Sequence, residues 1–164
     1  FPLLLDRLLI YSPKQLKLNR IMKTKKNIQE LRNTNLIILF DGVCNFCDQS
    51  VNFIIKRDTK DKFLYAPLNS DAGIEFIKTQ SEKVKNTDSI ILITNNKVYS
   101  KSTAAIKIVS KLKGLWFLMS LFYIVPSFIR DTVYDYIAKN RYQWFGKLDS
   151  CRVINVKEKN KFLN

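Results

Sequence analysis

The sequence predicts a single α/β domain, for three reasons. Short apolar runs typical of strands alternate with segments of helical spacing between residues 35 and 113. Hydrophobic residues make up 46% of the chain and charged residues 26%, which is an ordinary globular composition. The chain has 164 residues, which is enough for one core and an additional layer of helices.

The first half of this region predicts a strand–helix–strand–helix order. Residues 35–40 form a continuous apolar run, typical of a buried strand, and the turn signal Asp41-Gly42 ends it. Residues 47–55 then place apolar side chains at helical spacing. Residues 62–66 are a second strand candidate, and residues 71–80 are a weaker helix candidate. A strand–helix–strand unit of this kind requires a parallel pair of strands with a crossover helix.

The second half predicts a hairpin and a covering helix. Residues 89–94 repeat the apolar strand pattern, and Asn95-Asn96 turns the chain into another strand at residues 97–100. We expect Ser102 to cap a helix that Gly114 ends. The complete order of strand, helix, strand, helix, hairpin and helix is the connectivity of the thioredoxin and glutaredoxin core. We therefore predict a βαβαββα core.

The flanking segments complete the predicted domain organisation. Residues 1–33 are expected to be an N-terminal extension outside the core, and residues 1–21 within it are either an upstream extension or a short docking helix. Residues 34–153 are expected to form the thioredoxin-like domain, which includes additional C-terminal helices. Residues 154–164 are expected to be a polar tail.

Residues 114–129 form a separate apolar stretch of 16 uncharged residues that contains a proline. A helix needs about 20 predominantly apolar residues to span a bilayer. We therefore expect a buried helix here, and contact of this segment with a membrane is the alternative. A further helix is expected over residues 126–140.

The net charge of +14 is large for a chain of this length. A basic surface attracts nucleic acid or anionic lipid. The lysines are scattered, however, and no helix-turn-helix, zinc-finger or aromatic RNA-binding pattern accompanies them. We therefore expect a mostly solvated basic surface and no nucleic-acid partner, with weak contact to a membrane surface as the alternative.

The absence of histidine removes several reaction classes. It excludes Cys–His and Ser–His nucleophile pairs, and it excludes His-ligated metal sites. The chain has three cysteines and no convincing signal peptide, a combination that argues against a disulfide scaffold and for a reducing compartment. We predict a cytoplasmic protein that keeps its cysteines for chemistry, with membrane-peripheral association as an alternative.

The central candidate for chemistry is the pair Cys44 and Cys47, which lies at the start of the first predicted helix. Their spacing puts two sulfurs within one helical turn. Unpaired backbone N–H groups and the helix dipole favour an anion there, so the pKa of the Cys44 thiol is expected to fall from about 8.5 to roughly 3.5–7.5. We predict that Cys44 is the nucleophile and that Cys47, one turn deeper and better shielded, is the resolving thiol.

Other roles for these residues compete with a redox role. A structural zinc site or an iron–sulfur cluster usually needs four protein ligands, and Cys151 would supply only a third. We predict no metal and no cofactor, although two or three thiolates would satisfy a soft ion such as Cu(I). Asp41 is either a turn residue or a proton acceptor for the thiols. Cys151 is either a buried structural cysteine or an accessory resolving thiol.

The sequence Asp41-Gly42-Val43-Cys44-Asn45-Phe46-Cys47 resembles the signature of the DCC family of predicted thiol–disulfide oxidoreductases. The resemblance extends over about residues 36–153. Further matching segments are Tyr65-Ala66-Pro67-Leu68, Ser102-Thr103-Ala104-Ala105, Ala138-Lys139-Asn140-Arg141-Tyr142, and Trp144-Phe145-Gly146-Lys147 with Cys151. The resemblance to this family implies a thioredoxin-like fold and a redox role for Asp41, Cys44 and Cys47.

Two functions follow as hypotheses. The first is a thiol–disulfide oxidoreductase that acts on a disulfide-containing protein or a small-molecule thiol substrate and is served by a separate reductant. The second is a non-catalytic thioredoxin-like module that docks on a partner or a membrane surface.

Thioredoxins place a cis-proline before the third strand, whereas Thr87-Asp88 stands at that position here. The aromatic residues Tyr134, Tyr142, Trp144 and Phe145 are expected to be core or lid residues, and a groove for an apolar substrate is the alternative.

Overall fold

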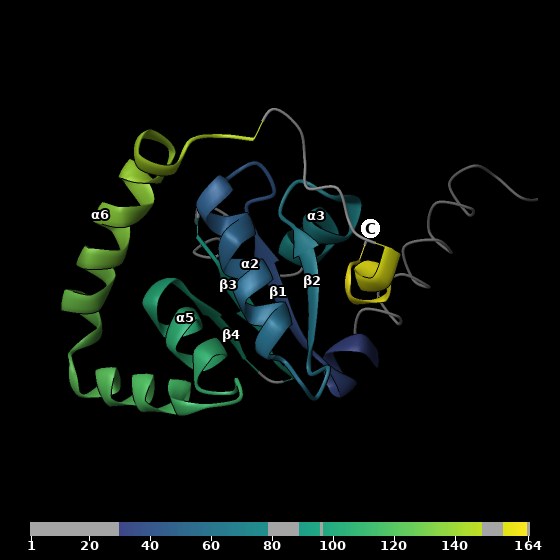
Figure 1. The fold of residues 1–164 in the computed structure, drawn as a ribbon, viewed down its shortest axis with the longest axis horizontal. Coiled ribbons are helices and arrows are strands. Elements are labelled where there is room, and N and C mark those ends of the chain that lie inside the picture. The colour runs from purple at the N-terminus through teal and green to yellow at the C-terminus, as the bar shows by residue number, and fades with distance from the viewer. Residues whose placement is uncertain (1–29, 79–88, 96, 149–155, 164) are drawn as a thin grey trace, which may run out of the picture.

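The computed structural model describes residues 30–78, 89–95, 97–148 and 156–163. Four strands and several helices follow one another along the chain (Figure 1). In order they are β1 (Leu36–Phe40), α2 (Asn45–Arg57), β2 (Phe63–Pro67), α3 (Asp71–Lys78), β3 (Ile91–Ile93), β4 (Val98–Ser100), α5 (Lys101–Val109), the 3₁₀ helix η1 (Leu115–Ile124), α6 (Ser127–Phe145) and the 3₁₀ helix η2 (Val156–Lys161).

The strands form one mixed sheet in the order β2-β1-β3-β4. β1 and β2 are parallel, with Ile38 opposite Tyr65, and α2 makes the crossover between them. β3 runs antiparallel to β1, with Leu92 opposite Ile38, and β4 completes the hairpin with β3. This arrangement confirms the predicted βαβαββα order, and the chain has a thioredoxin-like fold.

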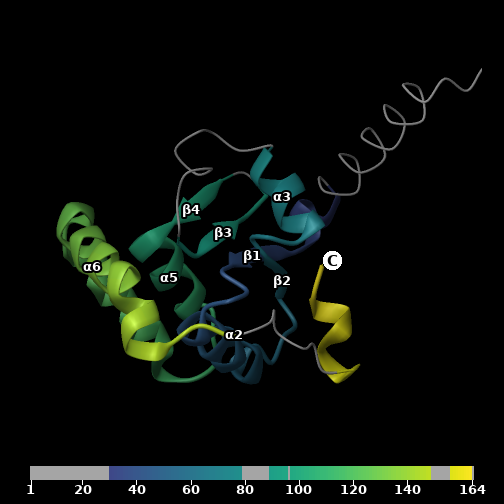
Figure 2. The same cartoon turned by 90° about the horizontal axis from the view of Figure 1, so that it is seen from above.

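Helices cover both faces of the sheet. Figure 2 shows α3 on one side of the strands and α2 with α5 on the other. Because successive side chains of a strand point to opposite faces, β1 contributes to two cores. Ile38 and Phe40 pack in the cluster beneath α2 and α5, whereas Ile37 and Leu39 pack with Phe76 of α3. Burial on both faces explains why β1 is apolar throughout.

The boundaries of α5 differ from those predicted. Its N-cap is Ser100 rather than Ser102, and the helix ends at Val109, well before Gly114. The Ser102 hydroxyl instead donates a hydrogen bond to the Asp131 carboxylate of α6. Gly114 adopts a φ of 103°, in the left-handed region, where a glycine avoids the steric penalty of a side chain. The chain turns there into η1.

The prediction of a buried helix over residues 114–129 is wrong. None of the ten residues of η1 is buried. The face of the sheet on this side is already occupied by α2 and α5, so η1 is left on the outside, where Figure 1 shows it beside α5 and leading into α6. In the part of the chain that the structure describes, no helix is both long and apolar enough to cross a membrane.

Residues from both flanking segments contact the core. Leu31 packs against the cluster formed with α3, and the Arg32 guanidinium donates to the Asn95 carbonyl at 3.3 Å. In the segment predicted as a polar tail, Phe162 is buried and its ring centroid lies 5.5 Å from that of Tyr65. The Leu163 amide donates to the Tyr65 carbonyl at 2.8 Å, so this segment pairs with β2.

Candidate active site

Cys44 is the N-cap of α2, directly after the loop that leaves β1. Its backbone is extended (φ −91°, ψ 119°), and its Sγ accepts a hydrogen bond from the Cys47 amide at 3.3 Å. The Cys44 carbonyl accepts the first helical hydrogen bond, from the Asp48 amide at 2.9 Å. The first amides of a helix have no partner within it and carry the positive end of its dipole. The Cys44 sulfur therefore lies where a negative charge is stabilised.

The loop before Cys44 is held by Asp41. One carboxylate oxygen of Asp41 accepts from the Val43 amide at 3.0 Å, which is the geometry of an Asx turn. Gly42 packs against the end of β2, because a Cβ at this position would lie 3.1 Å from the Pro67 Cβ. The Asp-Gly pair thus fixes the approach of the chain to Cys44, and the turn role predicted for Asp41 is present.

The other carboxylate oxygen of Asp41 faces α6. It forms an ion pair with the Arg141 guanidinium at 2.8 Å and accepts a hydrogen bond from the Tyr142 hydroxyl. The same guanidinium nitrogen of Arg141 donates to the Tyr142 oxygen at 3.1 Å. The Arg141 side chain is only 4% exposed and that of Asp41 13%. Arg141 had no predicted role, although the matching segment Ala138-Lys139-Asn140-Arg141-Tyr142 contains both residues.

Residues 145–148, called here the cover segment, fold back over Cys44. Lys147 pairs with Cys44 in an antiparallel bridge, and the Leu148 amide donates to the Val43 carbonyl at 2.9 Å. The Asn45 side-chain amide donates to the Phe145 carbonyl at 3.1 Å. The Phe145 ring also stacks on that of Phe46, with centroids 4.8 Å apart. The C-terminal block therefore closes over the start of α2.

This cover reverses the expected accessibility of the two thiols. Cys44 is 0% exposed, whereas Cys47 is only partly buried. The prediction that Cys47 is the better shielded thiol is wrong. The position on the helix does not decide exposure here, because the cover segment lies over the helix end itself.

The surroundings keep the Cys47 thiol protonated. Burial raises its pKa, and so do the hydrogen bond and the negative charge of Cys44. The charge of Arg141 acts in the opposite direction, and the charge of Asp41 raises the pKa again. Burial and the hydrogen bond to Asp41 also raise the pKa of Tyr142 to about 12. Asp41 and Arg141 are thus close enough to influence the ionisation of Cys47.

The remaining predicted residues divide into two groups. Cys151 and Thr87-Asp88 lie outside the described residues. Of the aromatic residues, Tyr142 contacts Asp41 and Phe145 is part of the cover, whereas Tyr134 accepts a hydrogen bond from the Ile90 amide, just before β3, at 3.0 Å. Trp144 is half-exposed, and its ring meets those of Tyr136 and Phe145 edge-on, so it does not belong to the core.

Cys44 and Cys47 are free thiols in this structure. Within the described ranges, no group of three or more His, Cys, Asp or Glu side chains is placed to hold a metal ion. Binding of a soft metal ion such as Cu(I) by the thiols stays the untested alternative to the prediction of no metal.

Residues 38–147 match the sequence model of the DCC1-like thiol-disulfide oxidoreductase family. This chain belongs to that family. The matched region contains the Asp-Gly turn, both thiols and the Arg141–Tyr142 pair, and it ends within the cover segment. Family membership confirms the resemblance noted in the sequence, and it supports thiol–disulfide oxidoreduction as the general class of activity.

Two relatives place the chain within the family. It is 45% identical over 129 residues to the uncharacterized protein YuxK of Bacillus subtilis, covering 79% of this chain and 94% of YuxK. It is 36% identical over 119 residues to a DCC family protein of Arabidopsis thaliana described as chloroplastic, covering 71% of this chain and 69% of that protein. No solved structure matches the chain.

Proposed function

We propose that this chain catalyses thiol–disulfide exchange with Cys44 as the nucleophile and Cys47 as the resolving thiol. The observation that carries the proposal is the hydrogen bond from the Cys47 amide to the Cys44 sulfur at the start of α2. A sulfur that accepts a backbone N–H at a helix N-terminus is stabilised as the thiolate, which is the attacking species. No metal or organic cofactor takes part in the cycle.

The proposed cycle moves two electrons from the dithiol to a disulfide. The Cys44 thiolate attacks one sulfur of the substrate, forms a mixed disulfide and releases the other substrate sulfur as a thiolate. Cys47 loses its proton and attacks the Cys44 sulfur, which breaks the mixed disulfide and releases the second substrate thiolate. Two protons from the dithiol and the solvent neutralise the products. A separate dithiol reductant then reduces the Cys44–Cys47 disulfide.

Asp41 supports the second step in this proposal. The raised pKa of Cys47 means that its proton must be removed before it attacks. The charge of Asp41 acts on Cys47, and we propose this carboxylate as the group that receives the proton through water. Arg141 and Tyr142 act as positioning residues, because their hydrogen bonds hold one Asp41 oxygen toward α6.

Access to Cys44 requires movement of the cover segment. Because Cys44 is fully buried beneath residues 145–148, a disulfide reaches its sulfur only after the pairing of Lys147 with Cys44 opens. The backbone groups released from this pairing are then free to pair with an extended peptide. We therefore propose a small-molecule disulfide or a flexible peptide disulfide as the substrate.

A redox titration tests the assignment. The full chain is equilibrated in glutathione buffers of stepped potential, alkylated at acid quench and analysed by mass spectrometry. We expect a two-electron transition that protects Cys44 and Cys47 together, with Cys151→Ser behaving as the wild type. Cys44→Ser and Cys47→Ser each abolish this transition. A wild type that forms no Cys44–Cys47 bond at any potential contradicts the proposal, and so does a bond that always includes Cys151.

The burial of Cys44 also favours a second candidate, a non-catalytic module that keeps the fold. Iodoacetamide distinguishes the two candidates, because an active nucleophile reacts in the folded state whenever the cover opens. Alkylation of Cys44 at neutral pH, faster than global unfolding, supports the enzyme. Alkylation only at the rate of unfolding supports the module.

A further inference from the structure

A large apolar surface lies away from the redox site, on η1 and the beginning of α6. Every side chain in it is exposed, with Leu121 at 59% and Ile124 at 80%. Monomeric soluble proteins rarely expose contiguous apolar patches larger than a few hundred Å². We call the following residues the η1 surface: Leu115, Phe117, Leu118, Leu121, Phe122, Ile124, Phe128, Ile129 and Val133.

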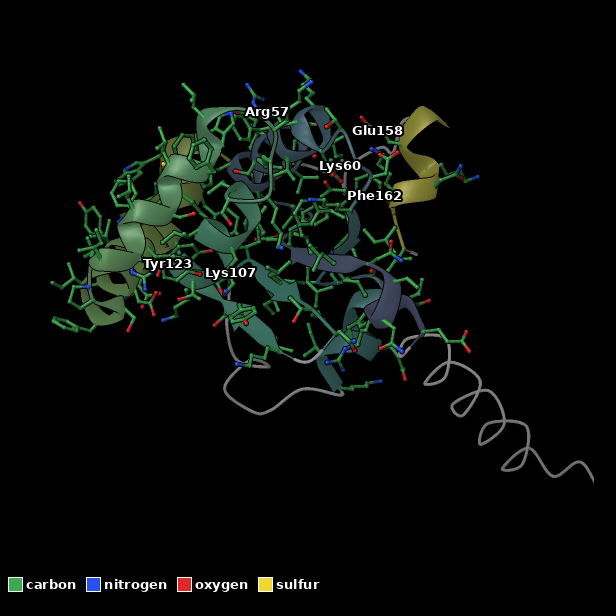
Figure 3. The ribbon with its side chains drawn as sticks, turned by 90° about the horizontal axis from the view of Figure 1, so that it is seen from below. Arg57, Lys60, Lys107, Tyr123, Glu158 and Phe162 are labelled. Carbon is green, nitrogen blue, oxygen red and sulfur yellow. The ribbon has the colours of Figure 1, made fainter. Side chains whose placement is uncertain are left out.

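The η1 surface is carried by an element that is anchored on its inner side. The Trp116 ring meets the Phe53 ring of α2 edge-on, with centroids 4.8 Å apart. The ring of Tyr123 lies between the Lys107 ammonium at 5.5 Å and the Arg130 guanidinium at 5.1 Å, and Figure 3 shows Lys107 beside Tyr123. These contacts fix which side of η1 faces the protein and leave the aliphatic and phenyl side chains pointing outward.

Positive charge borders the η1 surface at its beginning. Lys111 and Lys113 precede it, and both are exposed. The two acidic residues in this part of α6 are engaged within the protein, because Asp131 accepts a hydrogen bond from the Ser102 hydroxyl and Asp135 forms an ion pair with Lys101 at 2.7 Å. An apolar surface with a basic rim is the pattern of a protein segment that lies in a membrane interface.

The overall charge selects among the partners that would cover such a surface. The chain carries a net charge of +14, so two copies that meet through a basic-rimmed surface repel each other. An anionic bilayer attracts the same charge, at about 1 kcal/mol for each Lys or Arg near the lipid surface. The exposed aromatic residues Phe117, Phe122 and Phe128 are of the type that inserts at the boundary between headgroups and acyl chains.

We propose that the η1 surface docks this protein on an anionic membrane. The apolar side chains of the surface enter the interface, and the exposed Lys111 and Lys113 lie over the lipid phosphates. The protein rests on one leaflet and does not cross it. α6 runs from this surface to the cover segment, so docking holds the redox site near the membrane. The proposal does not depend on the proposed redox cycle.

Vesicle co-sedimentation of the full chain tests this docking. Vesicles of phosphatidylcholine with one quarter phosphatidylglycerol are compared with vesicles of phosphatidylcholine alone. We expect binding to the anionic vesicles that weakens with added NaCl, because salt screens the attraction. Leu121→Gln with Ile124→Gln is expected to lower the partition coefficient about tenfold or more, since these side chains lose their apolar insertion. Lys111→Gln with Lys113→Gln is expected to lower it by roughly 30-fold at low salt, because two lysines contribute about 2 kcal/mol.

Matched controls separate docking from general effects of substitution. Ile74 is an exposed apolar residue of α3, on the opposite side of the sheet, and Ile74→Gln should leave binding unchanged. Figure 3 shows Lys60 away from Tyr123, and its side chain is exposed, so Lys60→Gln is the charge control. Circular dichroism verifies that each variant is folded. Equal loss in the controls, or no binding of the wild type to either vesicle, overturns the proposal. A dimer in sedimentation velocity that only Leu121→Gln with Ile124→Gln dissociates, without vesicle binding, also overturns it.

Discussion

Replacing Arg141 by glutamine removes the cation that pairs with Asp41. The burial and geometry of this pair determine the expected loss of unfolding free energy. The two side chains are 4% and 13% exposed, and the guanidinium lies 2.8 Å from the carboxylate. Breaking a buried ion pair from one side costs about 3–5 kcal/mol. Asp41 keeps its hydrogen bonds to the Val43 amide and the Tyr142 hydroxyl. We therefore expect Arg141→Gln to lower the free energy of unfolding by about 2–3 kcal/mol.

A double-mutant cycle isolates this pair. Asp41→Asn leaves the buried guanidinium without its counter-ion and is also expected to cost about 2–3 kcal/mol. The double variant contains neither charge, so it should be less destabilised than the sum of the single variants by roughly 2 kcal/mol. Distant sites add to within about 0.3–0.5 kcal/mol, so a coupling of this size is measurable.

Urea unfolding of the reduced protein provides the assay. The matched control is Lys101→Gln, which breaks another ion pair of α6, to Asp135 at 2.7 Å. Its side chains are 31% and 42% exposed, so the control should cost no more than about 1 kcal/mol. If the losses of unfolding free energy in Arg141→Gln and Asp41→Asn simply add in the double variant, the reasoning is refuted. An Arg141→Gln variant that is as stable as the control also refutes it.

Three further predictions concern pH, access and the C-terminal segment. Because the pKa of Cys47 and that of Tyr142 are raised in the folded state, their contribution to stability is complete below about pH 8.5 and falls as the pH rises above it. Urea midpoints between pH 7 and pH 10.5 should fall less steeply in Cys47→Ala, and an unchanged slope would contradict this. Phe145→Ala removes a ring stack worth about 0.5–1.5 kcal/mol, so iodoacetamide should alkylate Cys44 about 2- to 10-fold faster; an unchanged rate shows that the cover does not limit access. Phe162→Ala should cost about 3–5 kcal/mol in thermal or urea unfolding, and a cost below 1 kcal/mol would mean that the segment does not belong to the core.

The order of the core elements is predictable because each element has its own local pattern. β1 is apolar at every position because both of its faces are buried. The start of α2 follows from the Asp-Gly turn, and the parallel pairing of β1 with β2 follows from the crossover. The extent of α5 is not predictable in the same way. Ser102 fits an N-cap by residue type, but its hydroxyl is engaged by Asp131 of another helix.

Local spacing also predicts the roles of the two thiols and Asp41, but it does not predict that Arg141 and the cover segment contact them. The Asp41–Arg141 contact joins residues 100 positions apart, and the cover reaches Cys44 from a similar distance. Contacts of this separation leave no periodic signal in one sequence. The prediction that residues 114–129 form a buried helix is wrong for a related reason. An apolar run indicates burial only if a free face of the core remains to receive it, and α2 and α5 already occupy that face.

Trapping of the mixed disulfide tests the central assignment most directly. Cys47→Ser and Cys44→Ser, each with Cys151→Ser, are incubated with oxidised glutathione, and the modified residue is identified by peptide mass mapping. We predict that Cys47→Ser accumulates glutathione on Cys44, because its resolving thiol is missing, and that Cys44→Ser remains largely unmodified. Stable glutathione on Cys47 of the Cys44→Ser variant, with Cys44 unmodified in the other, would contradict the account.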